Sequence, residues 1–269
     1  MPDLPDYENP PVVEVAACVQ FAPIKELAGA HLGAYWARIR APFSRVQEQS
    51  PMAHVVEPED LSPARGPQVE FAHELPLPRT WFSIPNGTEL IQVQRDRFVY
   101  NWRKQAKEDV YPRFAYVQGK FREHWSDFRA FLTEEDLPEP TVDQCELTYV
   151  NLIPKGEGWK VMGDWENVFS TFVWGSRPGF LPLPERVTWK LSFKLPTGEG
   201  RLHVSAEPVF VPPENNLAAR FTLTVRGVPQ GEPDDDRISN WFTTAREWIV
   251  RGFADLVTER ADKLWGRKA

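Results

Sequence analysis

The sequence predicts an α+β protein built around a long, curved antiparallel sheet with long helices packed on one face. Several segments alternate apolar and polar residues at the period of a strand, beginning with residues 12–21. Two long segments instead repeat apolar residues at helical spacing. The order of these elements occurs twice along 269 residues, a length above that of an average domain. We therefore expect two α+β halves, 1–140 and 141–269, that form one continuous sheet and a tandem β-α-β-β-β-α duplication.

The first half is predicted to run from a strand through a helix and further strands to a long helix. Pro23 ends the first strand, and apolar residues from Leu27 to Val46 then recur at helical spacing. Pro42 lies inside this pattern and predicts a kink or two helices end to end. The remaining elements are an irregular loop at 51–68, which carries four prolines, strands near 68–75, 80–84, 89–94 and 97–103, and an amphipathic helix from about 114 to 132.

The second half is predicted to repeat that order. It begins with a strand near 144–153, followed by a short helix for which Asp164 is the expected N-cap. Strands at 186–195, 200–211 and 217–227 come next, and the first two form a hairpin. Asp236 or Ser239 begins one continuous final helix of about 26 residues that ends near Trp265. The matching order of elements, more than any residue match, is what indicates the duplication.

Composition limits the classes of function. The net charge of −7 argues against a protein that coats nucleic acid by bulk charge. Cys18 and Cys145 lie in apolar strands and are expected to be buried thiols, not a disulfide framework or a zinc site. No histidine spacing, glycine-rich loop or nucleophile elbow indicates a catalytic site, a metal or a cofactor. No signal peptide and no apolar run of about 20 residues is found, so we expect a cytoplasmic protein.

One face of the predicted sheet offers candidate binding residues. Where helices cover the apolar face, the alternate strand positions point away from them. Basic residues outnumber acidic ones at those positions, which fits a surface for an anionic partner. It also fits an ordinary solvated face, which antiparallel sheets commonly have. The candidate binding residues on this face are Gln92, Gln94, Arg97, Asn101, Arg103, Lys190, Lys194, Arg201, His203, Arg220 and Arg226.

Two narrower features of these strands also bear on function. Residues 95–104 interleave basic and aromatic side chains, as single-strand binding requires. Alternation, however, places Phe98, Tyr100 and Trp102 on the core side. Glu14 and Glu146 would face each other if the halves pair through their first strands, and such a carboxylate pair is the one candidate for acid–base chemistry.

The sequence also resembles a known family. Residues 5–14 (PDYENPPVVE) resemble the opening Y-x-N-P-P-V-x-E signature of a sporadically distributed bacterial family of uncharacterised proteins of about this length. Residues 92–94, 101–103 and 264–267 resemble its later signatures. The resemblance implies no activity and no catalytic residues. The family's patchy distribution is similar to that of genes in defence or toxin–antitoxin-like loci.

These observations favour a non-enzymatic binding protein with a protein partner, as part of a bacterial defence or toxin–antitoxin-like locus. One alternative is nucleic-acid binding through the basic sheet face. The other is an enzyme with an unrecognised site between the halves.

Overall fold

A computed structural model describes residues 4–58, 77–174, 180–196, 198–231 and 235–268. Within these residues the chain forms a nine-stranded sheet in which every pairing is antiparallel. The strands are β1 (Val12–Phe21), β2 (Arg45–Gln49), β3 (Arg79–Ser83), β4 (Glu89–Gln94), β5 (Arg97–Arg103), β6 (Val142–Pro154), β7 (Trp189–Lys194), β8 (Arg201–Val211) and β9 (Asn216–Gly227). The helices are α1 (Gly29–Ile39), α2 (Phe114–Glu134), the 3-10 turn η1 (Met162–Asn167), α3 (Asp235–Leu256) and α4 (Glu259–Leu264). The α+β class and the antiparallel sheet are confirmed.

The two halves of the chain meet at the centre of the sheet. The strand order is β2-β3-β4-β5-β1-β6-β9-β8-β7, so β1 and β6 pair directly. In each half the first strand lies at the centre and the last strand lies beside it, since β5 neighbours β1 and β9 neighbours β6. One sheet therefore runs through both halves. No described helix is long and apolar enough to cross a membrane.

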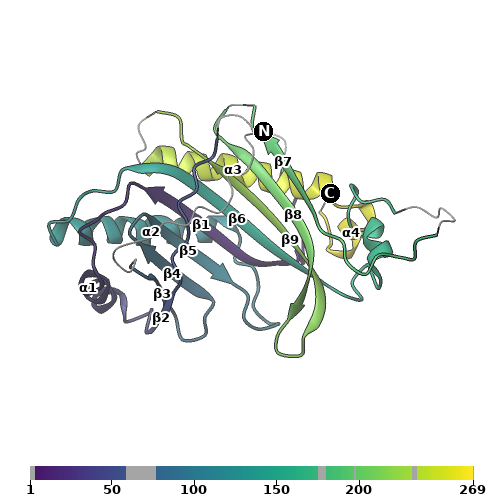
Figure 1. Ribbon diagram of the computed structural model, residues 1–269, viewed down its shortest axis with the longest axis horizontal. Coiled ribbons are helices and arrows are strands. Elements are labelled where there is room, and N and C mark those ends of the chain that lie inside the picture. The colour runs from purple at the N-terminus through teal and green to yellow at the C-terminus, as the bar shows by residue number, and fades with distance from the viewer. Residues whose placement is uncertain (1–3, 59–76, 175–179, 197, 232–234, 269) are drawn as a thin grey trace.

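The core lies between the sheet and its two long helices. Figure 1 shows α2 and α3 behind the strands; α2 contacts β5 and β1, and α3 contacts β6 and β9. Phe98 on β5 is fully buried against the rings of Trp125 and Phe128 on α2, with centroids 5.5 and 5.3 Å away. Tyr100 and Trp102 are buried on the same side of β5. Strand alternation therefore predicted correctly which side of β5 faces the helices.

The first predicted helix is too long. α1 ends at Ile39, and the segment that follows Pro42 forms strand β2 instead of a second helix. Proline lacks the N–H that a helix interior needs and disfavours helical geometry at the preceding residue. Val46, assigned by spacing to the helix, is 45 % exposed on β2, where it pairs with Phe82 of β3. The predicted strand at 68–75 falls outside the described residues.

The final helix is not continuous. It breaks at Val257 and Thr258, because the backbone there bonds to the segment after η1: Thr258 N–H donates to the carbonyl of Val168. Thr258 then caps α4 by accepting from the N–H of Ala261 at 3.2 Å. Asp164 is not an N-cap either. It lies inside η1 and accepts from the preceding N–H groups of Lys160 and Val161.

Candidate functional site

The strand registers place all eleven candidate binding residues on the sheet face opposite α2 and α3. Residues paired across neighbouring strands point to the same side of a sheet. Gln94 pairs with Arg97, and Arg97 pairs with Gln20 on β1. On the other half, Arg226 pairs with Arg201, which pairs with Lys194. We call this surface the polar face.

A segment of the chain itself lies across the polar face. Residues 52–58, which follow β2, contact β4, β5, β1, β6 and β8 in turn, and so run across the strands and not along them. We call these residues the crossing segment. It lies within the predicted loop at 51–68, but sequence reasoning gave it no role.

Two glutamines bind the main chain of the crossing segment at two points each. The N–H of Met52 donates to Gln94 Oε1, and Gln94 Nε2 donates back to the carbonyl of Met52, both at 2.8 Å. Gln20 binds Val55 in the same manner, at 3.2 and 3.1 Å. A side-chain amide has both an acceptor oxygen and a donor nitrogen, so it can bind the N–H and the carbonyl of one residue at the same time.

A third glutamine extends this pattern towards the second half. Gln144 on β6 accepts from the N–H of Glu57 at 2.7 Å and donates to the carbonyl of Val55. Arg97 donates to the carbonyl of Ala53 at 3.0 Å. The crossing segment is therefore held mainly through groups that every residue except proline possesses.

Glu57 supplies the one anionic anchor of the crossing segment. Its side chain is 7 % exposed and forms ion pairs with Arg201 and His203 of β8. Arg226 of β9 lies 3.8 Å away. Burial opposes ionisation, but the hydrogen bonds and charges of His203 and Arg201 outweigh it and hold the pKa of Glu57 below its ordinary value. Arg201, His203 and Arg226 therefore form a binding site for a carboxylate at this corner of the polar face.

The apolar side chains of the crossing segment are only partly covered, and the Met52 sulfur accepts from Arg79 at 2.8 Å and from Arg97 at 3.4 Å. Met52 and Val55 are each 39 % exposed, and Val56 is 67 % exposed. His54 makes polar contacts instead, with Asp96 at 3.0 Å and Asp143 at 3.2 Å. The segment is thus bound through main-chain and polar contacts with little apolar burial, which is typical of regions that open locally.

A row of hydrogen bonds orders the polar face beside the segment. Arg79 donates to Gln92, Gln92 donates to Asn101, and Asn101 donates to Glu14, at 2.9, 2.7 and 2.6 Å. Burial raises the pKa of Glu14, against the opposing effects of Arg103 and Asn101. Hydrogen-bonded rows of this kind fix side-chain orientation.

The candidate residues differ in how far they remain accessible. Arg97, Asn101 and Arg201 are buried, as are Gln92 and Gln94. The other cations of the face are engaged or peripheral. Arg226 pairs with Glu146, Arg220 with Glu207, Arg103 lies over the Trp81 ring, and Lys190 and Lys194 are exposed on the edge strand β7.

The structure separates the two carboxylates considered for acid–base chemistry. β1 and β6 do pair, but Glu146 lies opposite Cys18, whereas Glu14 lies opposite Val150. The expectation that Glu14 and Glu146 face each other is therefore wrong, because the antiparallel register offsets them by four residues. In the described parts of the chain, no group of three or more His, Cys, Asp or Glu residues could hold a metal ion.

Comparison with known proteins adds no assignment. No family model matches this chain. No significant match is found among curated proteins. What the polar face can do is therefore inferred from its geometry.

Sequence reasoning missed Gln144, Asp96 and Glu57 as parts of the site. The available signal was a set of glutamines at neighbouring strand positions on the polar face: Gln20, Gln94 and Gln144. A side-chain amide in a strand that is expected to be buried needs a partner with both a donor and an acceptor. The identity of that partner, a proline-flanked segment, follows only from the tertiary structure.

Proposed function

We propose that this protein is a non-enzymatic binding protein whose polar face takes an extended segment of a partner protein. The partner segment would replace residues 52–58 and carry an acidic side chain in the position of Glu57. The observation that carries this proposal is the two-point binding of Met52 and Val55 by Gln94 and Gln20. These contacts recognise a peptide backbone of almost any sequence.

The crossing segment has the features of an exchangeable occupant. Its apolar side chains are exposed, so few apolar contacts would be lost when it leaves. Glu57 provides the selective contact, since Arg201 and His203 favour an anion. Because the segment is tethered, its effective concentration is about millimolar, and a partner must compete with that. The segment would therefore act as an internal competitor that sets a threshold for the partner.

The same geometry supports the alternatives less well. Nucleic-acid binding needs cations free to contact phosphates. Arg97, Arg201 and Arg226 instead contact Gln20, Glu57 and Glu146. An enzyme with a carboxylate pair between the halves loses its support because Glu14 and Glu146 are not opposite each other.

Three further features belong to the proposal. The two halves share the same order of strands from the centre of the sheet outward, which favours a tandem duplication. In that duplication β1, β5 and α2 would be equivalent to β6, β9 and α3. The resemblance of residues 5–14 favours a role in a bacterial defence or toxin–antitoxin-like locus. We place the protein in the cytoplasm, where such a partner would be met.

A labelled peptide tests the proposal. The peptide spans residues 50–58 and is titrated by fluorescence anisotropy onto the full-length protein and its Glu57→Gln variant. The variant releases its own segment and leaves the Arg201 and His203 corner without an anion. We expect it to bind the peptide about tenfold more tightly than the unaltered protein does, and a peptide with Gln in place of Glu to bind about tenfold more weakly.

Glu48→Gln is the matched control, because Glu48 is an exposed residue of β2 outside the crossing segment. It should bind the peptide like the unaltered protein. Absence of peptide binding to Glu57→Gln, or equal binding of the Glu and Gln peptides, would refute the proposal. Salt-sensitive binding of a single-stranded oligonucleotide by the same variant would favour the nucleic-acid alternative.

A further inference from the structure

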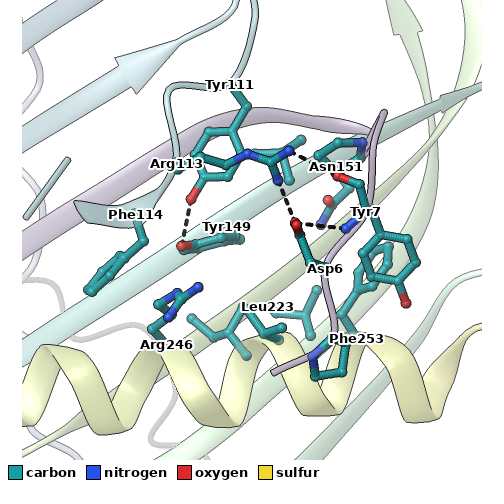
Figure 2. A pocket seen from close by; sticks show the side chains of 15 residues that line it. Asp6, Tyr7, Tyr111, Arg113, Phe114, Tyr149, Asn151, Leu223, Arg246 and Phe253 are labelled. Carbon is teal, nitrogen blue, oxygen red and sulfur yellow. Dashed lines mark hydrogen bonds and ion pairs between the residues drawn. The ribbon is translucent and has the colours of Figure 1, made fainter. Parts of the chain in front are cut away.

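A cavity lies on the helix side of the sheet, away from the polar face. It is lined by the N-terminal segment at Asp6 and Tyr7, by β6 at Tyr149 and Asn151, by β9 and by α3 (Figure 2). Its volume is about 80 Å³. A water needs roughly 10–15 Å³ by this measure, so the cavity has room for several waters or one small organic molecule.

Arg246 gives this cavity an uncompensated positive charge. It projects from α3 towards Tyr149, and its guanidinium lies 5.4 Å from the ring centroid of Phe114 (Figure 2). In the described part of the chain it forms no ion pair with a carboxylate. The neighbouring Arg113 differs, because Asp6 accepts from it at 2.8 Å. A half-buried arginine without a carboxylate favours an anionic ligand.

Asn151 adds an acceptor that lacks a donor. The residue is 1 % exposed and lines the cavity. Its Nδ2 donates to the carbonyl of Phe221 at 3.0 Å, whereas its Oδ1 has no hydrogen-bond partner among the described residues. Buried acceptors are rarely left unpaired, because the desolvation cost is not recovered. A ligand with an N–H or O–H group would satisfy this atom.

Two tyrosines supply a hydroxyl donor beside these groups. The hydroxyls of Tyr111 and Tyr149 lie 2.9 Å apart, so one proton joins them and the second remains available to a ligand. Burial raises the pKa of Tyr111 to about 12, and burial with the nearby Tyr111 raises that of Tyr149 well above its ordinary value. Both hydroxyls therefore stay protonated at neutral pH. Leu223 and Ile249 provide an apolar wall.

We infer that this cavity binds a small organic acid with a donor group next to its carboxylate, namely an α-amino or α-hydroxy acid with a short apolar side chain. The carboxylate would contact Arg246 and the free tyrosine hydroxyl. The amino or hydroxyl group would donate to Asn151 Oδ1, and the side chain would pack on Leu223 and Ile249. This site is independent of the peptide site on the polar face, and neither proposal needs the other.

Calorimetric titration of the full-length protein with four matched compounds tests the inference. L-valine and 2-hydroxy-3-methylbutanoate carry both the carboxylate and the donor. Isovalerate lacks the donor, and isobutylamine lacks the carboxylate. We expect at least one of the first two compounds to bind about tenfold more tightly than either of the last two. Because this comparison uses the unaltered protein, it does not depend on whether a variant folds.

Variants then assign the binding to the cavity. Arg246→Gln should weaken binding of the favoured acid by about tenfold or more. Arg251→Gln is the matched control on α3, because Arg251 lies outside the cavity and pairs with Glu247. It should leave binding unchanged. No heat from L-valine and the hydroxy acid, equal affinity for isovalerate, or equal losses in both variants would overturn the inference.

Discussion

The carboxylate of Glu57 and the imidazole Nε2 of His203 lie 2.8 Å apart, although 146 residues separate them in the chain. This contact joins a segment of the first half to a strand of the second. Together with Arg201 and the three glutamines, this contact holds the crossing segment on the polar face. Removing the charge of Glu57 should therefore release the crossing segment without disturbing the core behind the sheet.

Hydrogen exchange measures that release. In Glu57→Gln, the amides of Val55 and Glu57 lose the order that holds them on Gln20 and Gln144. We expect them to exchange about tenfold faster or more, while the amides of β1 and β6 keep their protection. Glu48→Gln should leave all of these rates unchanged. Uniform acceleration across the sheet would mean that Glu57 stabilises the whole fold and not the segment alone.

Acid should release the same segment. The pKa of Glu57 is depressed in the folded protein below its ordinary value of 4.5. A carboxyl group whose pKa is lower in the folded than in the unfolded protein stabilises the folded state. This stabilisation is complete above the pKa of the unfolded protein and is lost as the pH falls through the pKa of the folded protein. We therefore expect protection of Val55 and Glu57 to hold above pH 4.5 and to fall below it. In Glu57→Gln this pH dependence should be absent; its persistence would assign the effect to another group.

The aromatic core between β5 and α2 should dominate global stability. Phe98 is fully buried and contacts the rings of Phe121, Trp125 and Phe128. Phe98→Ala should lower the free energy of unfolding by about 3–5 kcal/mol, measured by urea denaturation. Phe180→Ala is the control, since Phe180 is fully exposed, and its effect should stay within about 0.5 kcal/mol. Equal effects would contradict the assignment of β5 aromatics to the core.

The Thr258 hydroxyl should stabilise the start of α4. Its hydroxyl accepts from Ala261 N–H at 3.2 Å and donates to the carbonyl of Asn167 at 2.6 Å. Thr258→Ala should destabilise the protein by about 1 kcal/mol, whereas Thr258→Ser keeps the hydroxyl and should cost less. Urea denaturation of the two variants makes the comparison. Equal losses would show that the methyl group, and not the cap, matters.

Local sequence determined which side of β5 faces the helices. Alternation placed Phe98, Tyr100 and Trp102 against the helices and put Arg97 and Asn101 on the opposite face, because the side-chain period of a strand is fixed at two. The two long helices were likewise predicted by their apolar spacing, at 114–132 and from 239 onward. The bounds of the first agree with α2, but the end of the second was not predicted, since the break at Thr258 depends on backbone bonds to Val168.

Local sequence alone determined most of the elements and the two faces of the sheet; strand β2 and the break before α4 were not among them. Only the tertiary structure decided what covers the polar face and which carboxylate meets Arg201. Periodicity reports the direction of a side chain relative to its own strand, and it carries no information about a distant segment of chain. The ion pair of Glu57 with Arg201 is such a long-range contact. It depends on the position at which the chain leaves β2 and on the strands of the second half that lie across the sheet from it.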